Sequence, residues 1–237
     1  MRVFVFSAMK EEIESLLEDK RFNFVHLSHL GYDYYKCFYK GKELVLSVSG
    51  IGRVASAMFI TALHEFFRIQ ASDVLINIGS AGGISPLKIG DCLAFDDCVY
   101  GDANVSWMGN TYRYGQMAGC PFNYSGDKDT LMKLKKVLNQ DMKVCCMTNE
   151  MFTTDLVKTK NLLNDHYKDF NVLAFDMESA AYAQAAYKLG LRFCAVRFIT
   201  DIIGSENQTD DYINNNESGN KKSDKVLKDA VLAYLEL

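Results

Sequence analysis

The sequence predicts an α/β fold, a three-layer α/β/α sandwich in which a mostly parallel central sheet lies between two layers of helices. Three observations predict it. Strand-like and helix-like segments alternate along the chain, the strand-like segments are rich in Val, Ile and Phe, and only 2 of the 237 residues are Pro. Apolar strands of this kind are typical of parallel sheets covered on both faces. No repeat or linker interrupts the pattern, so we expect a single domain over residues 1–237.

The first segments follow the expected alternation. Arg2–Ser7 is an apolar strand, and Lys10–Leu17 has the spacing of a helix. Tyr34–Ser49 predicts two strands, because Gly41-Lys42 supplies a turn between them. A second glycine-containing turn then leads into an amphipathic helix over Arg53–Phe67.

A glycine-rich segment follows the next strand. Val74–Ile78 is strand-like, and the sequence NIGSAGG, residues Asn77–Gly83, ends in small residues. Such a composition is typical of a turn where backbone closes around a ligand, and Cys92–Tyr100 predicts the strand after it.

The C-terminal half continues the same pattern. The expected strands are Lys143–Met147, Val172–Phe175 and Phe193–Ile199, and the expected helices are Lys128–Leu138, Glu178–Leu189 and Lys225–Leu235. Gly204–Lys225 is polar and rich in Asn, which predicts a surface loop or a mobile lid.

Composition narrows the class of protein. The formal net charge of −4 provides no basic surface for nucleic acid or anionic lipid, so neither partner is expected. The 7 cysteines form no CxxC or Cys/His spacing, so we expect reduced, mostly buried thiols and no metal site. The apolar run at the N-terminus is too short for a signal peptide, which predicts a cytoplasmic protein.

Candidate functional residues come from the ends of the predicted strands. In open parallel sheets ligands bind beyond the carboxyl ends of the strands. The polar residues and glycine turns at these places are Glu11, Glu12, Gly50–Gly52, Gly79–Gly83, Asp176, Glu178, Arg197, Thr200 and Asp201.

Each of these residues has a simpler structural explanation when taken alone. Glu12 could interact with the positive end of a helix dipole, and Asp176 could be the N-cap of a helix. Asp201 could cap a turn, and the Arg197 side chain could extend to the edge of the sheet. Together, several carboxylates, one Arg and two glycine turns at one sheet edge predict a pocket for a neutral, polyhydroxylated ligand that undergoes acid/base chemistry.

Seven motifs carry a family resemblance. They are SAMKEE, SGIGRVASA, INIGSAGG, GDCLAFDDCVYGDANV, YGQMAGCP, FDMESAA and VRFITD. In order and spacing the chain resembles the 5′-methylthioadenosine/S-adenosylhomocysteine nucleosidases, which have the nucleoside phosphorylase fold, from residue 1 to about residue 203. The resemblance implies hydrolysis of the N-glycosidic bond of both nucleosides, which releases adenine and a thioribose. It also implies a homodimer that uses no metal or cofactor.

The resemblance assigns roles to individual residues. Glu12 matches the family's general base, Asp201 the acid that protonates adenine, and Glu178 with Met177 the ribose-binding pair. Ser80 and Arg197 match positions that help hold the water. The remaining matches are Phe152, which stacks on adenine; Thr153, which contacts adenine through its backbone; and Met9, Ile51, Val105 and Met108, which surround the sugar and its sulfur substituent.

The local sequence adds expectations about charge. Ile199, Ile202 and Ile203 surround Asp201 with apolar side chains, which should raise its pKa and suit it to donate a proton. Glu178 lies at a predicted helix start, where backbone dipoles should favour the ionised form.

The glycine segment should hold the sugar and its water rather than phosphate. The related phosphorylases place Arg residues where this chain has Asn77 and the acidic stretch Lys10-Glu11-Glu12.

Other functions remain alternatives. Asn149-Glu150 replaces the usual Gly-Asp pair and Thr153 replaces an aliphatic residue, which bears on the substrate ranking. One alternative is a nucleosidase for another adenosine-like substrate, such as aminodeoxyfutalosine or 5′-deoxyadenosine. The others are a true phosphorylase and a non-catalytic binding protein on the same fold.

Overall fold

The strands of the computed structural model, which describes residues 1–105, 107, 111–216 and 222–237, form one large mixed sheet. The order of its main path is β2-β3-β4-β1-β5-β10-β9-β7-β8, and β11 pairs with both β5 and β6. The strands are β1 (Arg2–Ser7), β2 (Val25–His29), β3 (Tyr32–Tyr39), β4 (Lys42–Val48), β5 (Val74–Gly83), β6 (Cys92–Ala94), β7 (Asp97–Tyr100), β8 (Asn123–Ser125), β9 (Cys145–Thr148), β10 (Val172–Asp176) and β11 (Phe193–Ile202).

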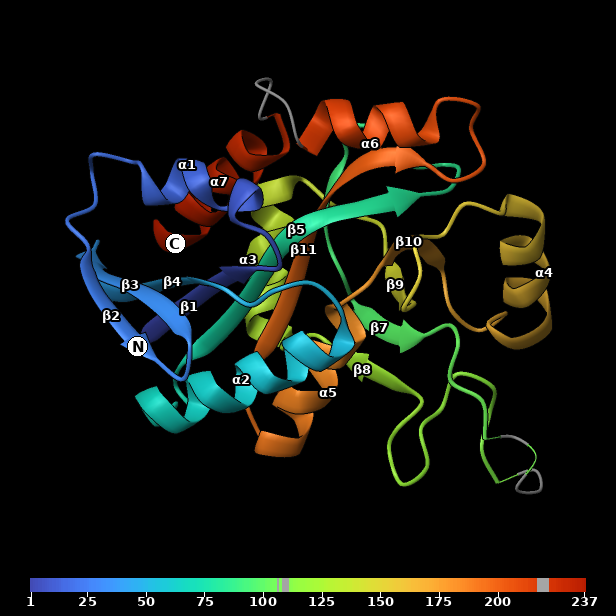
Figure 1. The fold of residues 1–237 in the computed structure, drawn as a ribbon, viewed down its shortest axis with the longest axis horizontal. Helices are drawn as coiled ribbons and strands as arrows, with labels where there is room; N and C mark the ends of the chain where they lie inside the picture. Colours follow the sequence, from blue (N-terminus) through green and yellow to red (C-terminus); the bar gives the residue numbers. More distant parts are fainter. Residues whose placement is uncertain (106, 108–110, 217–221) are drawn as a thin grey trace.

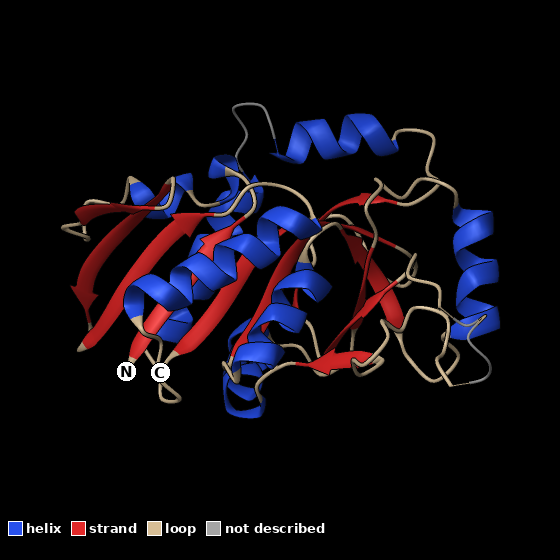
Figure 2. Cartoon of the chain, turned by 60° about the horizontal axis from the view of Figure 1, so that its bottom comes forward, coloured by secondary structure: helices blue, strands red, loops and turns tan. Residues whose placement is uncertain are grey.

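Helices cover both faces of the sheet, as Figures 1 and 2 show. They are the 3₁₀ helix η1 (Lys10–Glu12) and the α-helices α1 (Glu14–Leu17), α2 (Arg53–Phe67), α3 (Lys128–Leu138), α4 (Leu156–His166), α5 (Ser179–Leu189), α6 (Gln208–Asn216) and α7 (Lys222–Leu235). Helices α2 and α5 pack together on one side, and α1, α3 and α7 lie on the other. Helix α6 packs against the end of β11. The predicted α/β fold class is confirmed.

The direction of the strands differs from the expectation of a mostly parallel sheet. The pairs β1–β4, β1–β5, β5–β11, β9–β10 and β7–β9 are parallel. The pairs β2–β3, β3–β4, β5–β10, β6–β11 and β7–β8 are antiparallel. Hairpins at the margins of the sheet account for part of this difference, since a short turn can join only antiparallel neighbours.

Two hydrophobic clusters hold the helices on the sheet. Along β1, Phe4 and Phe6 belong to one cluster and Val3 and Val5 to the other, because successive strand side chains point to opposite faces. The first cluster includes side chains of α2 and α5, and the second includes side chains of α7. The sheet is therefore anchored on both faces.

The sequence located several elements closely. The strand Arg2–Ser7 and the helices Arg53–Phe67 and Lys128–Leu138 have the predicted bounds. Lys10–Leu17 instead divides into η1 and α1, and Cys92–Tyr100 divides into β6 and β7. Strands β2 and β8 and helix α4 were not predicted from the sequence.

The expectation of a loop over Gly204–Lys225 is wrong where α6 forms and at the start of α7. Helix α6 forms because Gln208 and Tyr212, four residues apart, share a face that packs toward the end of β11 and the segment after β9. Residues 217–221 lie outside the described residues.

The glycine segment is the main correction within the sheet. The predicted turn over Gly79–Gly83 is a continuation of strand β5. A Cβ at Gly79 would lie 3.1 Å from the Glu12 carboxylate, and one at Gly82 would lie 3.0 Å from that of Asp201. These glycines therefore permit two acidic side chains to approach the strand closely. The segment has the glycine-rich composition of a turn, but its backbone is that of a strand.

The 7 cysteines are all free, and five of them are buried, as expected for reduced small hydrophobic residues. Within the described residues no helix has the length and apolar character needed to cross a membrane.

Candidate active site

A pocket opens where β5, β10 and β11 end, at the edge of the sheet that the sequence predicted. It encloses about 450 Å³ including its open mouth. Its lining residues are Ala8, Met9, Glu12, Ile51, Ser80, Ala81, Gly82, Phe152, Phe175, Asp176, Met177, Glu178, Thr200, Asp201 and Tyr212. The structure therefore brings together most of the residues predicted from separate parts of the sequence.

Glu12 and Ser80 form a hydrogen-bonded pair in this pocket. Both the backbone N–H and the hydroxyl of Ser80 donate to Glu12 Oε1, each at 2.8 Å, and the Met9 N–H donates to Oε2 at 3.3 Å. Burial raises the pKa of the Glu12 carboxyl, and the charge of Arg197 opposes part of that rise. Glu12 is thus a fixed carboxyl group whose affinity for a proton exceeds that of an ordinary glutamate.

Glu178 lies nearby at the N-terminus of α5. Its Oε1 accepts a hydrogen bond from the Gly52 N–H at 2.9 Å. Burial and the neighbouring Asp176 carboxylate raise the pKa of Glu178 to about 7. The expectation that the helix start would favour the ionised form is therefore wrong, because burial and a like charge outweigh the backbone donor.

Arg197 and Asp176 support this part of the pocket from behind. Arg197 donates from a terminal nitrogen to Asp176 Oδ2 at 2.8 Å, and both residues are buried. Asp176 also accepts from Thr148 Oγ1 at 2.6 Å and from the Ser179 N–H at 3.1 Å, so it does contribute to the start of α5. We refer to Glu12, Ser80, Asp176, Glu178 and Arg197 as the Glu12 end of the pocket.

Asp201 is fully buried on the other side of the pocket, where the pairing of β11 with β5 shifts register between Ile199 and Asp201. Bulges of this kind re-aim side chains next to functional sites. Thr200 Oγ1 donates to Asp201 Oδ1 at 2.7 Å, and Gln208 Nε2 donates to Oδ2 at 2.8 Å. Burial raises the pKa of Asp201 despite these two donors, as the sequence predicted.

Two aromatic rings border the same side. Phe152 is 43% exposed, and its ring meets that of Tyr212 edge-on at 5.2 Å between centroids. An adjoining hollow is lined by Phe152, Thr153 and Asp201, among others. We refer to Phe152, Thr153, Thr200, Asp201 and Gln208 as the Asp201 end of the pocket. It combines a buried acid with an accessible aromatic face.

Some predicted site residues lie elsewhere. Arg197 acts through Asp176 and lies outside the lining of the pocket. Val105 is half-buried after β7, also outside the lining of the pocket as the described residues form it, and Met108 lies outside the described residues. Sequence reasoning missed Gln208 and Thr148, whose side chains hold Asp201 and Asp176. Thr148 directly follows the predicted strand Lys143–Met147, so its place at a strand end is a signal that could have found it, whereas Gln208 lies in a segment predicted to be a loop.

The pocket is suited to proton transfer at two places. Its charged lining residues in the described structure are all acidic, namely Glu12, Asp176, Glu178 and Asp201. Groups of three or more His, Cys, Asp or Glu arranged to hold a metal ion are not found in the part of the chain that the structure describes. Burial raises the pKa of both Glu12 and Asp201, so each end of the pocket has one carboxyl group that binds a proton more tightly than an exposed carboxyl group does.

Comparisons with known proteins agree with this architecture. The family model of the phosphorylase superfamily matches residues 2–232. An S-adenosylhomocysteine nucleosidase from Streptococcus pyogenes, solved with 5-methylthiotubericidin, is 31% identical, with a TM-score of 0.87 over 100% of this chain and 96% of that chain.

Two further solved structures are similar. The 5′-methylthioadenosine/S-adenosylhomocysteine nucleosidase of Streptococcus pneumoniae, with a transition-state inhibitor, is 29% identical, with a TM-score of 0.87 over 100% of this chain and 99% of that chain. The enzyme from Colwellia psychrerythraea, with adenine, is 25% identical, with a TM-score of 0.85 over 99% and 94%. The chain therefore belongs to the phosphorylase superfamily and, within it, to the 5′-methylthioadenosine/S-adenosylhomocysteine nucleosidases.

Proposed function

We propose that this protein hydrolyses the N-glycosidic bond of 5′-methylthioadenosine and S-adenosylhomocysteine, releasing adenine and the thioribose. The observation that carries the proposal is the placement of Glu12 with Ser80 opposite Asp201 in one pocket, each carboxyl group buried and held by hydrogen bonds. Its relatives with bound adenine or nucleoside analogues support the substrate class.

Bond cleavage needs a proton at the leaving base and a nucleophile at the sugar. The electrons of the bond between C1′ and N9 move onto adenine, and Asp201 donates its proton to N7. Burial, which raises the pKa of Asp201, keeps that proton available. Phe152 offers a ring face on which the base stacks.

The sugar becomes cationic as the base departs. Glu12 takes a proton from water, whose oxygen forms the new bond to C1′, and Ser80 holds the Glu12 carboxylate in place. Glu178 accepts hydrogen bonds from the ribose hydroxyls, with Met177 beside it. Met9 and Ile51 supply apolar contacts to the sugar side, and Arg197 acts by limiting the pKa of Glu12. No cofactor is assigned a part in these steps.

The charge of the pocket favours water over phosphate as the nucleophile. A phosphate dianion requires cationic donors, and Arg or Lys is absent from the described lining residues. Asn77 is buried and donates to the Phe6 carbonyl at 2.9 Å. The ionised carboxylates among the acidic side chains of the pocket would repel a dianion at close range.

Base release is the direct test. The purified protein is incubated with 5′-methylthioadenosine, S-adenosylhomocysteine, adenosine and inosine, with and without phosphate. We expect free adenine from the first two at a rate that phosphate does not change. A sugar 1-phosphate product would show a phosphorylase, and absence of base release from all four nucleosides would contradict the proposal and favour a binding protein.

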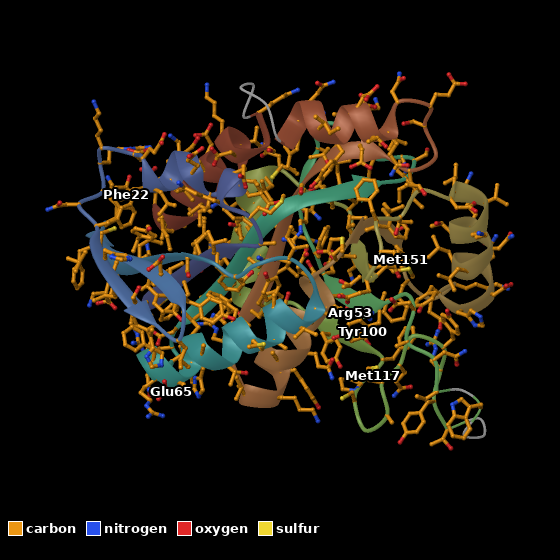
Figure 3. The ribbon with its side chains drawn as sticks, viewed as in Figure 1. Phe22, Arg53, Glu65, Tyr100, Met117 and Met151 are labelled. Atoms are coloured by element: carbon orange, nitrogen blue, oxygen red, sulfur yellow. The ribbon has the colours of Figure 1, made fainter. Side chains whose placement is uncertain are left out.

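We also propose a homodimer formed through α2 and α5. Val54 and Met58 on α2 are 71% and 60% exposed, and a groove beside them is lined by Arg53, Tyr100 and Met117, which Figure 3 labels along this side of the molecule. An exposed apolar face of this kind is typical of a protein interface.

Sedimentation tests the dimer. Met58→Glu should shift the protein to a monomer, whereas Val157→Glu, at a 70% exposed position on α4, should not. A wild-type monomer at micromolar concentration would contradict the proposal.

The cytoplasmic location remains a prediction from the N-terminal sequence.

A further inference from the structure

Gln208 is a buried amide with every polar side-chain atom in a hydrogen bond. It is the first residue of α6 and only 5% exposed. Its Nε2 donates to Asp201 Oδ2 and to the Thr153 carbonyl, both at 2.8 Å, and its Oε1 accepts from the Gly204 N–H at 2.9 Å. One side chain thus fixes the orientation of the Asp201 carboxyl group from outside the sheet.

The partners of Gln208 come from separate parts of the site. Asp201 belongs to β11, and Thr153 belongs to the segment after β9 that also carries Phe152. One helical turn after Gln208, Tyr212 packs edge-on against Phe152. Helix α6 therefore touches the acid through Gln208 and the aromatic ring through Tyr212.

The chemistry of the amide suits this place. A cation beside Asp201 would hold the carboxylate ionised, which would remove the proton that it has to donate. A neutral amide orients the carboxyl group with a weaker preference for the ionised form. Its two N–H groups also join the Asp201 carboxyl group to the Thr153 carbonyl, so the distance between the acid and the segment that carries Phe152 is fixed.

We propose that Gln208 is a positioning residue that joins Asp201, the Phe152 segment and α6 into one hydrogen-bonded unit, so that the acid and the stacking ring are held in register around the departing base. This rests on the proposed function, since it needs Asp201 to be the acid and Phe152 to contact adenine.

Other charged groups near Asp201 have to be considered in a pH experiment. Asp211, on α6, raises the pKa of Asp201 through its like charge. Glu12, Asp176 and Glu178 line the same pocket. These groups are unchanged in every variant used below, so a difference between variants reports on the hydrogen bonds of Asp201.

The test replaces Gln208 by Met, which keeps the length and removes the hydrogen bonds. Gln140→Met is the matched control, because Gln140 is 8% exposed and also makes three hydrogen bonds, to both backbone groups of Ala94 and to the Met142 carbonyl, away from the pocket. Thr200→Val is the second control, because it removes the other donor to Asp201 and leaves Gln208 intact.

We expect Gln208→Met to lower kcat by about 10- to 100-fold, as a small misplacement of a catalytic group does. Its KM should rise, and the alkaline limb of kcat/KM should move to higher pH, because Asp201 loses a donor that stabilises its ionised form. Thr200→Val should move the limb in the same direction with little change in KM. Gln140→Met should lower the melting temperature without moving the limb.

Two results would overturn the assignment of Gln208. One is an unchanged pH profile with wild-type kcat and KM. The other is a loss of activity in Gln208→Met that equals its unfolded fraction, as expected for Gln140→Met, while the alkaline limb of kcat/KM stays at the wild-type pH. If the wild-type protein releases no base at all, the proposed function fails instead. Adenine affinity by calorimetry then still decides the part played by Gln208: about tenfold weaker binding than in Gln140→Met supports it, and equal affinity overturns it.

Discussion

The Glu12 end and the Asp201 end of the pocket differ in the groups that oppose the burial-raised pKa of their carboxyl groups. Each end holds a buried carboxyl group, and burial raises the pKa of both Glu12 and Asp201. At the Glu12 end the buried Arg197 guanidinium opposes that rise. At the Asp201 end the opposing groups are the neutral donors Thr200 and Gln208.

The difference between the two ends matches the two halves of the reaction. A general base must be able to lose its proton before it can accept one from water, and a nearby cation makes that possible. A general acid must keep its proton, and neutral donors orient it without removing that proton. The same functional group, a buried carboxyl, thus acquires opposite roles from the side chains that pack behind it.

Loss of either carboxyl group should have the largest effect. Asp201→Asn and Glu12→Gln should each lower kcat by about 10²–10⁴-fold, because each removes one proton-transfer group. The two ends can then be separated with a nitrophenyl riboside, whose leaving group departs without a proton. On that substrate Asp201→Asn should recover most of the wild-type rate, and Glu12→Gln should not. Equal recovery of both variants would contradict the division of roles.

Removal of the cation should affect one end alone. Arg197→Met leaves Asp176 buried without its partner, so the free energy of unfolding should fall by about 3–5 kcal/mol. The pKa of Glu12 should rise without the Arg197 charge, so the acid limb of activity should move to higher pH.

The control for Arg197→Met is Arg192→Met, which breaks a partly exposed pair with Asp127 and should cost about 1 kcal/mol. Urea unfolding and pH profiles give both quantities. A shift of the alkaline limb in Arg197→Met would show that the two ends are not independent.

The same comparison explains what the sequence could reveal. Glu12, Glu178 and Asp201 were found because each lies at the end of a predicted strand or the start of a helix, which is local information. The supporting groups depend on contacts across the chain. Gln208 lies in a polar segment, QTDDYINNN, with few strong helix formers, and tertiary contacts decide that it is helical.

The pattern of small residues was ambiguous for a similar reason. The small residues predict a turn at Gly79 and Gly82, but both are strand positions that admit the Glu12 and Asp201 side chains. A strand that needs close approach and a turn that needs a positive φ select the same residue. The raised pKa of Glu178 cannot be predicted from the local sequence either, because its burial beside Asp176 is a property of the packed structure.

Glu178 allows a test of the Glu12 end through stability. Its pKa is 4.5 without burial and about 7 in the folded protein, so the folded state binds the proton more tightly. The stabilisation from this proton is complete below pH 4.5 and is lost as pH rises through about 7. The difference between these pKa values corresponds to about 3 kcal/mol.

Urea unfolding of wild-type protein and Glu178→Gln between pH 4.5 and 7.5 measures this contribution. The wild-type protein should lose stability relative to Glu178→Gln across that range, because only the wild-type protein loses the Glu178 proton as the pH rises. Parallel stability curves would contradict the raised pKa of Glu178.

The smallest effect is expected at the rim of the Asp201 end, where Phe152 stacks on the base in both the bound substrate and the transition state. Base stacking on an aromatic ring contributes about 1–3 kcal/mol, and Phe152→Ala should lie near the lower limit because Tyr212 remains on the same side. KM should therefore rise about tenfold with kcat nearly unchanged. Phe38→Ala, at a 75% exposed position on β3, is the control and should change neither. A collapse of kcat with constant KM would mean that the ring acts on the transition state alone, as the carboxyl groups do, and the distinction between a proton-transfer centre and its binding rim would be lost.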